Sequence, residues 1–215
     1  MRGKFIVFEG IDGSGKTTQI NQLAKWLKET NFMPKEKELV ITREPGGTQL
    51  GRSLRSLLLD TSTEQSPDAV TELLLYAADR AQHIHEIIRP SLNQGHWIIS
   101  DRFSGSTLAY QGYGRKLDLK LIKELELIAT QGISPDITFL LDIPVEESIK
   151  RRRKKKDDRI EKEGKDFLLN VSLGFEILCQ DSKWKRLTAN KSIDEITSEI
   201  KFEIENLLNI NEKTI

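Results

Sequence analysis

Cysteine is almost absent from this sequence. Cys179 is the single one, so neither an internal disulfide nor a zinc site built from several cysteines is possible. Net charge is absent too, because 33 Lys and Arg residues balance 33 Asp and Glu residues. A chain without net charge has no global attraction for nucleic acid or for anionic lipid, so any basic function has to be local.

Long apolar runs are also missing. Even the longest, such as residues 137–143, are interrupted by polar residues, and crossing a bilayer takes about 20 apolar residues. The first residues, Met1-Arg2-Gly3-Lys4, lead directly into a strand-like segment, and we expect no signal peptide there. No Pro- or Gly-rich linker divides the chain. We therefore expect one soluble, intracellular domain over residues 1–215.

Short apolar segments alternate with longer segments of helical periodicity. The predicted strands are 4–9, 39–42, 96–100, 137–142 and 184–188. The predicted helices are 16–30, 49–59, 67–92, 117–130, 145–155, 166–180 and 192–208. Several strands are almost continuously apolar, which is typical of parallel strands buried on both faces. The pattern predicts an α/β fold, with a parallel sheet covered by helices on both faces.

A phosphate-binding loop follows the first strand. Gly10-Ile11-Asp12-Gly13-Ser14-Gly15-Lys16-Thr17 fits the pattern G-x-x-x-x-G-K-T, with a strand before it and a helix after it. The glycines let successive backbone N–H groups point at phosphate oxygens, and the helix directs its positive end to the same place. Lys16 is expected to reach the β- and γ-phosphates, and Thr17 to hold a magnesium ion.

Such a loop does not by itself identify an activity, because switch GTPases, motor ATPases and small-molecule kinases all carry one. A guanine-specific switch needs an Asn-Lys-x-Asp segment. Asn190-Lys191-Ser192-Ile193-Asp194 comes close, but its Asp lies one residue too far along. Ser192 is better interpreted as a helix N-cap, with Asp194 as a charge in the first turn.

Three further segments are predicted to lie near the carboxyl ends of the strands, where ligands bind in open α/β sheets. Arg43 follows the second strand, next to the tight turn Pro45-Gly46-Gly47, and is placed to hold a phosphate. Asp101-Arg102 follows the third strand and suits a metal-water ligand and a phosphate clamp. A buried structural ion pair is the alternative for these two residues.

The third segment lies on a helix. Tyr76 and Arg80 are four residues apart and share a helix face. An aromatic ring beside a guanidinium suits a planar base, through stacking and a hydrogen bond to a ring carbonyl. Considered alone, Tyr76 is more often a core residue and Arg80 more often pairs with a carboxylate.

Together these motifs resemble those of the thymidylate kinases. The matching segments are residues 8–19, 42–48, 76–80, 101–103 and 109–112. The resemblance implies transfer of the ATP γ-phosphate to dTMP with Mg²⁺, a step in dTTP synthesis for DNA replication. It also implies a P-loop nucleoside monophosphate kinase fold with a five-stranded parallel sheet and a short basic lid. A cytoplasmic homodimer is implied as well, without nucleic acid or membrane as a partner.

The resemblance implies roles for individual residues. Residues 10–17 cradle the ATP phosphates, and Asp12 receives the 3′-hydroxyl of the deoxyribose. Arg43 and Arg102 clamp the dTMP phosphate, and Lys16 and Arg102 act in the transfer itself.

The base and the sugar have their own residues in this resemblance. Tyr76 takes the position of the aromatic ring that stacks on thymine, and Arg80 faces a base carbonyl. Tyr110 lies near the sugar carbon that would carry a 2′-hydroxyl, and Gln111 lies near the base.

The basic run at residues 150–159 has three interpretations: a solvated helix face, a nucleic-acid patch, or the lid of this kinase family. The last is favoured by the position of the run and by Gly13, which stands where some family members have an arginine. The resemblance then implies that the lid, about residues 150–164, supplies the cation. The candidates are Arg153, Lys155 and Arg159, with Arg151 as an alternative.

Two other features are interpreted as structural. The histidines have no metal-ligand spacing, and we expect them to face solvent or to cap helices; they are His83, His85 and His96. The apolar face of residues 121–128 is either core or dimer surface. Two other functions stay open: a kinase for another nucleoside monophosphate or a deoxynucleoside, and a P-loop NTPase that acts by binding a partner.

Overall fold

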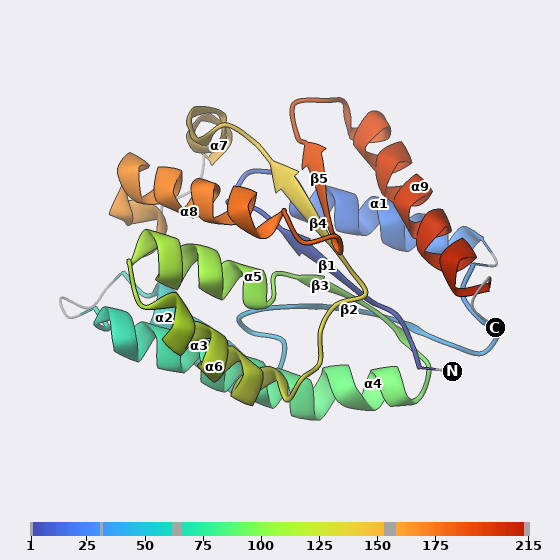
Figure 1. Ribbon diagram of the computed structural model, residues 1–215, viewed down its shortest axis with the longest axis horizontal. Coiled ribbons are helices and arrows are strands. Elements are labelled where there is room, and N and C mark those ends of the chain that lie inside the picture. Colours follow the sequence, from blue (N-terminus) through green and yellow to red (C-terminus); the bar gives the residue numbers. More distant parts are fainter. Residues whose placement is uncertain (1, 31, 62–65, 153–157, 213–215) are drawn as a thin grey trace.

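A computed structural model describes residues 2–30, 32–61, 66–152 and 158–212 (Figure 1). The strands are β1 (Phe5–Glu9), β2 (Leu39–Arg43), β3 (Trp97–Asp101), β4 (Ile137–Asp142) and β5 (Trp184–Thr188). The longer helices are α1 (Lys16–Glu29), α2 (Gln49–Leu59), α3 (Ala69–His83), α6 (Leu119–Thr130), α7 (Val145–Arg152), α8 (Lys165–Leu178) and α9 (Ile193–Glu212). The short ones are α4 (Arg89–Asn93), α5 (Ser104–Thr107), the π-helices η1 (Ile84–Ile88) and η2 (Leu108–Gly114), and the 3₁₀ turn η3 (Glu161–Glu163).

The five strands form one parallel sheet in the order β2-β3-β1-β4-β5. All five predicted strands are confirmed, with ends that move by no more than one residue. The central strand β1 is buried along its whole length. Because parallel strands end at a common edge, the loops after β1, β2 and β3 meet there, and these loops carry the predicted phosphate and acceptor residues.

Helices cover both faces of the sheet (Figure 1). On one face, Ile6 and Phe8 of β1 pack in a core with residues of α1 and α9, such as Leu23 and Ile200. On the other face, Phe5 and Val7 join a second core with Ile84 and Ile88 of η1 and Leu92 of α4. Alternate residues of one strand thus serve two cores, which confirms the predicted α/β fold class.

Two helical segments differ from the sequence prediction. The helix predicted at 67–92 is capped by Asp68 and changes to π geometry at η1 before α4 ends it. The helical segment formed by α5 and η2, residues 104–114, was missed altogether. Its sequence holds Gly105, Gly112 and Gly114 and has little apolar periodicity, so local propensity gives no helix signal. It carries Tyr110 and Gln111, and π-helices often occur at functional sites.

At the C-terminal helix the sequence interpretation holds. Ser192 and Glu195 form a reciprocal cap at the start of α9, so Asn190-Lys191-Ser192-Ile193-Asp194 begins a helix. Over the described parts of the chain, none of the helices has both the length and the apolar character that a membrane span needs.

Candidate active site

The phosphate loop joins β1 to the first turn of α1, as predicted. Gly10 has φ of 134°, and a Cβ there would lie 2.6 Å from the carbonyl oxygen of Leu141, so only glycine fits. Lys16 is 6% exposed, and its Nζ donates to the carbonyl oxygens of Gly10 at 2.9 Å and Ile11 at 3.3 Å. Burial lowers the pKa of Lys16. The ammonium thus sits inside the loop, where incoming phosphate oxygens can replace the carbonyls.

A polar cleft opens in front of this loop and encloses about 1230 Å³. Its lining includes the phosphate loop and residues from five other segments, which are Arg43, Glu44, Arg55, Asp101, Arg102, Arg151, Arg152, Asp158 and Glu161. Six of the eleven charged side chains here are cationic, and five of these six are arginines, whose guanidinium groups suit phosphate oxygens.

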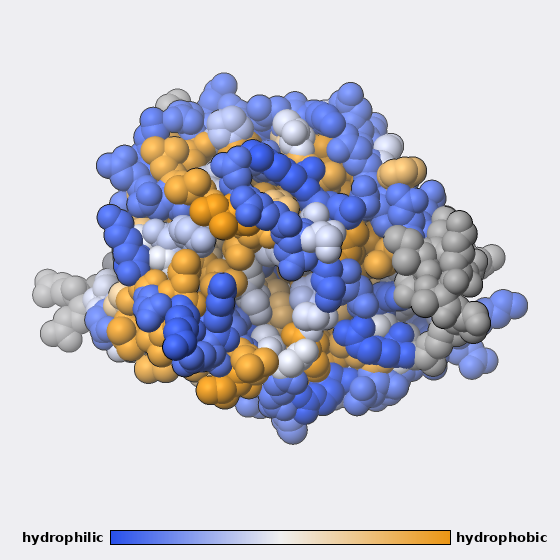
Figure 2. All heavy atoms as spheres, in the orientation of Figure 1, coloured by the Kyte–Doolittle hydropathy of each residue, from blue (hydrophilic) through white to orange (hydrophobic). Residues whose placement is uncertain are grey.

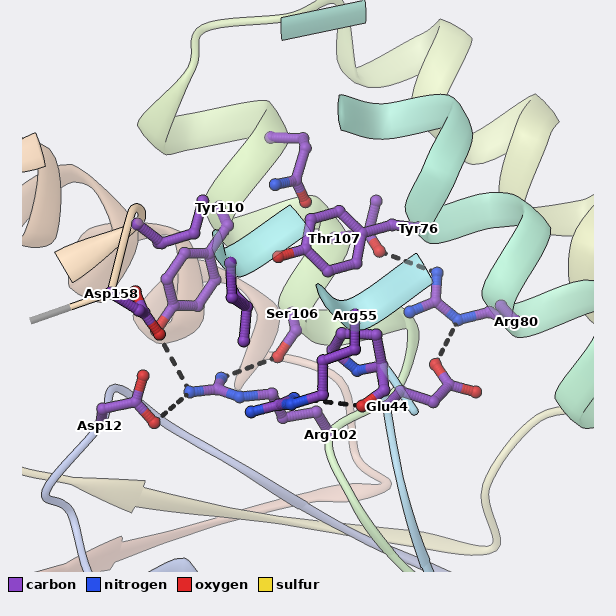
Figure 3. A pocket seen from close by; sticks show the side chains of 14 residues that line it. Asp12, Glu44, Arg55, Tyr76, Arg80, Arg102, Ser106, Thr107, Tyr110 and Asp158 are labelled. Carbon is purple, nitrogen blue, oxygen red and sulfur yellow. Dashed lines mark hydrogen bonds and ion pairs between the residues drawn. The ribbon is translucent and has the colours of Figure 1, made fainter. Parts of the chain in front are cut away.

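A smaller pocket of about 550 Å³ adjoins the cleft (Figure 3). It is lined by Tyr76 and Arg80 from α3, by Tyr110 and Gln111 from η2, and by Pro45 from the turn after β2. The cleft and the pocket share five lining residues: Asp12, Glu44, Arg55, Arg102 and Asp158. Two ligands could therefore meet at this shared wall, one polyanionic and one with a planar base.

Arg102 lies at the junction of the two cavities. It has φ of 75°, a conformation that a residue with a side chain rarely adopts and that often marks a functional position. Its Nη2 donates to Asp12 Oδ1 at 2.9 Å and to the Tyr110 hydroxyl at 3.3 Å, and its Nη1 donates to Ser106 at 3.0 Å (Figure 3). Arg102 pairs with Asp12 and not with Asp101, so the alternative of a structural Asp101–Arg102 pair is wrong.

Asp12 faces both cavities. Burial by itself would raise the pKa of its carboxyl, but Arg102 and Lys16 outweigh burial and hold that pKa well below its usual range. Asp12 is therefore an anion at neutral pH and accepts hydrogen bonds, as its predicted role toward a sugar hydroxyl requires.

Arg55 of α2 is a candidate that the sequence interpretation missed. It is half-buried, lines both cavities and donates from Nη1 to the carbonyl oxygen of Pro45 at 3.1 Å. Burial and the nearby charges of Arg43 and Arg102 lower the pKa of Arg55. Three guanidinium groups gathered at one place favour an anion such as an acceptor phosphate. In the sequence, Arg55 resembles any polar position on an amphipathic helix, so only the fold reveals it.

Arg80 is placed at the pocket wall, but it is also part of a buried ionic network. Its Nε donates to Glu44 at 2.8 Å, and its Nη1 donates to Thr107 at 2.8 Å and to Glu126. The expectation that Arg80 pairs with carboxylates is thus confirmed. Among the described residues no hydrogen bond is recorded for Arg80 Nη2, which leaves one nitrogen for a ligand. The ring of Phe103 packs against the guanidinium, 5.3 Å from Cζ.

The described residues include 150–152 and 158–164 of the predicted lid. Arg153 and Lys155 lie outside the described residues. Arg151 and Arg152 line the polar cleft, and they fill the space beside Gly13, where an added Cβ would lie 3.1 Å from the carbonyl oxygen of Ser148. A side chain in place of Gly13 would therefore need α7 to shift by a few tenths of an ångström, and the φ of 81° at this position is unfavourable for any residue other than glycine.

Arg159 is placed differently from the sequence expectation. Its guanidinium is buried against Glu72 of α3 and donates to the carbonyl oxygen of Leu58, and it is not among the residues that line the cleft. Glu72 also accepts from Gln111 at 2.7 Å and from Arg115. In this structure Arg159 anchors the end of the lid segment to the pocket wall and does not point at the phosphate loop.

The predicted magnesium ligands lie in the same cleft. Thr17 is exposed at the start of α1, and Asp101 ends β3 beside β1. Asp101 Oδ1 is buried, and no described residue is its hydrogen-bond partner. No group of three or more His, Cys, Asp or Glu side chains suited to a metal occurs in the described segments. A threonine hydroxyl and a buried carboxylate in one cleft are donors that suit Mg²⁺, which uses one or two protein oxygens together with substrate phosphates and water.

Glu9 stabilises the position of Arg102 through Ser106. Its buried carboxyl accepts from the backbone N–H groups of Phe103 at 2.9 Å and Ser106 at 3.0 Å, and from the Ser106 hydroxyl at 2.6 Å. Ser106 in turn accepts from Arg102. Burial raises the pKa of Glu9 to about 7, although Arg102 and these hydrogen bonds act against the rise.

This pKa predicts a pH dependence of stability. An unfolded glutamate titrates near pH 4.5, so from there to about pH 7 the folded state holds a proton that the unfolded state has lost. The proton on Glu9 stabilises the folded state fully below pH 4.5, and this stabilisation is lost as pH rises through 7. The loss in the free energy of unfolding is at most about 3 kcal/mol. We expect the free energy of unfolding of Glu9→Gln to fall less between pH 4.5 and 8 than that of the wild type, as measured by denaturant unfolding. An unchanged slope would contradict a titrating Glu9.

Comparisons with known proteins point to one family. The family model described as thymidylate kinase matches residues 8–200. The thymidylate kinase of Prochlorococcus marinus strain NATL1A is 74% identical over 208 residues, which cover 97% of this chain and 99% of that protein. The one from strain SARG is 60% identical and covers 93% and 91%. A crystal structure of thymidylate kinase from Ehrlichia chaffeensis has a TM-score of 0.77 at 36% identity and covers 95% of this chain and 100% of that one.

Proposed function

The chain belongs to the thymidylate kinase family, and we propose that its cleft and its pocket bind ATP and dTMP side by side. The protein is a kinase that transfers the γ-phosphate of ATP to dTMP and so produces dTDP and ADP, a step toward dTTP. The observation that carries the assignment to this site is the shared wall of the two cavities. Arg102, Arg55 and Asp12 stand where a phosphate from each ligand would meet.

The transfer needs little covalent chemistry from side chains. A phosphate oxygen of dTMP attacks the γ-phosphorus, the bond from that phosphorus to the β-phosphate oxygen breaks, and ADP leaves. The protein aligns the two phosphates and neutralises charge. Lys16 and the loop N–H groups hold the donor, while Arg43, Arg55 and Arg102 hold the acceptor. Arg151 and Arg152 are the described cations on the lid side that line the cleft.

Thr17 and Asp101 are the residues that would hold Mg²⁺. A bound Mg²⁺ ion would neutralise β- and γ-phosphate oxygens and fix their orientation. Asp101 would bind it directly or through water, which would give its buried Oδ1 a partner.

The base lies in the smaller pocket in this proposal. Tyr76 would stack on thymine, Arg80 Nη2 would donate to a ring carbonyl, and Gln111 would lie at the base edge. Tyr110 and Asp12 would surround the deoxyribose. The pocket suits a small planar base with carbonyl oxygens, and it is continuous with the phosphate cleft through Arg102.

A screen of acceptors tests this assignment. The protein with Mg-ATP is offered dTMP, dUMP, dCMP, dGMP, UMP and thymidine, and ADP formation is followed for each. We expect the highest kcat/KM with dTMP. A clear preference for another acceptor would indicate a different kinase, and ADP formation that needs no acceptor would favour an NTPase that acts through a partner.

We also propose a homodimer formed through α2, α3 and α6. Helix α3 packs against both α2 and α6, and Figure 2 shows apolar side chains in the region of α6. The exposed apolar residues of the three helices are Leu50, Leu57, Val70, Leu74, Leu121, Leu127 and Ile128. Within residues 121–128, Ile122 belongs to the core, whereas Leu121 and Ile128 face outward. An outward apolar surface of this extent is typical of a protein interface.

The dimer proposal predicts the effect of one charge. Ile128 is 72% exposed, so Ile128→Glu should leave the fold intact and place a carboxylate in the interface. We expect the wild type to have twice the mass of one chain by light scattering and the variant to be a monomer. Phe202→Glu on α9 is the matched control, because Phe202 is 60% exposed on a different helix. A monomeric wild type, or loss of the dimer in the control, would contradict the proposal.

Two further expectations belong with this proposal. Residues 150–164 would form the lid within one domain that spans residues 1–215. The reaction would take place in the cytoplasm, where ATP and deoxynucleotides are available.

A further inference from the structure

A buried histidine lies under the turn that carries Arg43. His83 ends α3 and is 0% exposed, so the expectation that it faces solvent or caps a helix is wrong. Its Nδ1 is 2.8 Å from Glu44 Oε1, and its Nε2 is 2.7 Å from Thr42 Oγ1. The imidazole therefore binds the residue before Arg43 and the residue after it.

The turn rests closely on this ring. A Cβ added to Gly47 would lie 2.7 Å from Cδ2 of His83, so the backbone approaches the imidazole as only glycine allows. One turn earlier on α3, Asp79 accepts from the N–H of Gly46 at 3.0 Å. Asp79 and His83, both on α3, thus contact the turn and stabilise it.

Glu44 connects His83 to the base pocket. Its Oε1 faces His83, and its Oε2 accepts from Arg80 Nε at 2.8 Å, so one buried carboxylate is shared by an imidazole and a guanidinium. Burial would raise the pKa of Glu44, but Arg80 and His83 outweigh it and lower that pKa. A carboxylate held from both sides fixes the plane of Arg80 and hence the direction of Nη2.

We propose that His83 is a positioning residue for acceptor recognition, which acts through Glu44 on Arg80 and so orients Nη2 toward the base. The inference rests on the proposed role of Arg80 in binding the base. His83 lines neither cavity, so this function follows from its contact with Glu44 and not from contact with a ligand. The contact with Thr42 stabilises the turn, and the contact with Glu44 carries the specificity.

Two amide substitutions separate these contacts. The amide of asparagine reaches about as far as Nδ1 of histidine, and the amide of glutamine reaches about as far as Nε2. His83→Asn should keep a donor to Glu44, and His83→Gln should keep only the contact with Thr42. We expect His83→Gln to lower kcat/KM for dTMP by about 10-fold or more, mainly through KM, and to weaken the preference for dTMP over dCMP. His83→Asn should stay within about threefold of the wild type, and the KM for ATP should not change in either variant.

A double-mutant cycle tests whether the effect passes through Arg80. In an Arg80→Ala background, His83→Gln should cause no further loss of the preference for dTMP over dCMP. His85→Gln is the matched control, because His85 lies two residues further along and is exposed. We expect it to behave as the wild type. Should His83→Gln not fold, Glu44→Gln takes its place in the same cycle, with the same expected result.

Three results would overturn the inference. The first is an equal loss in His83→Asn and His83→Gln, which would indicate a structural role alone. The second is a loss of base preference that persists without Arg80. The third is a His83→Gln enzyme with wild-type kinetics. A wild-type enzyme that did not phosphorylate dTMP at all would instead contradict the proposed function.

Discussion

Replacing Lys16 with alanine is expected to lower the turnover of dTMP by about 10²-fold or more. The reason is electrostatic, because the ammonium lies within the phosphate loop, where charge shifts from the γ-phosphate toward the β-phosphate oxygen during transfer. Losing one such preorganised donor costs about 10²- to 10³-fold in comparable sites. Steady-state kcat with saturating Mg-ATP and dTMP is the measurement.

The fold should survive this change. Among the described residues, the Lys16 ammonium bonds to the loop carbonyls of Gly10 and Ile11 and pairs loosely with Asp12 at 3.8 Å, and none of these contacts belongs to the hydrophobic core. Lys16→Met is the matched control, since it keeps the apolar stem and removes the charge, and it should be as slow as the alanine variant. Near-normal kcat in either variant, with normal thermal unfolding, would show that the loop does not bind the transferred phosphate.

Arg102→Ala is expected to have the second large effect, a fall of about 10²-fold or more in kcat/KM for dTMP. One guanidinium binds Asp12, Ser106 and Tyr110, so the substitution removes a phosphate ligand and also frees the groups around the sugar. Losing one preorganised donor costs about 10²- to 10³-fold in comparable sites. The KM for ATP should change far less, because Lys16 and the loop remain.

Arg102→Lys tests whether the guanidinium shape matters as well as its charge. A lysine has a point charge and cannot donate in a fixed planar fork to Asp12 and Ser106 together. We expect most of the loss to persist in Arg102→Lys. Full recovery by lysine would mean that Arg102 supplies charge alone, and an unchanged kcat/KM in Arg102→Ala would remove it from the acceptor site.

Much of the fold could be predicted because its signals are local. The strands around Ile6, Ile98 and Phe139 are almost continuously apolar, and their alternation with amphipathic helices leaves few arrangements other than a parallel sheet. The phosphate loop is a contiguous motif whose glycines are required by backbone geometry. Its position between β1 and α1 is confirmed.

The parts that could not be predicted depend on contacts between distant segments. His83 was expected at the surface, yet its partners Thr42 and Glu44 are about 40 residues away in sequence. Arg55 is half-buried at the cleft only because α2 packs behind the turn at Pro45. Arg159 was expected at the phosphate, but Glu72, which is 87 residues away, holds it at the pocket wall. No local pattern encodes such pairings.

The central claim is direct phosphate transfer between two bound nucleotides, and its most direct test is to follow the γ-phosphate of ATP. ATP labelled in its γ-phosphate is mixed with dTMP, Mg²⁺ and the protein, and the nucleotides are separated. A cleft and a pocket that meet at Arg102 predict that the label appears as the β-phosphate of dTDP, with one ADP formed for each dTDP. Label released as inorganic phosphate, with dTMP unchanged, would contradict direct transfer between two bound nucleotides.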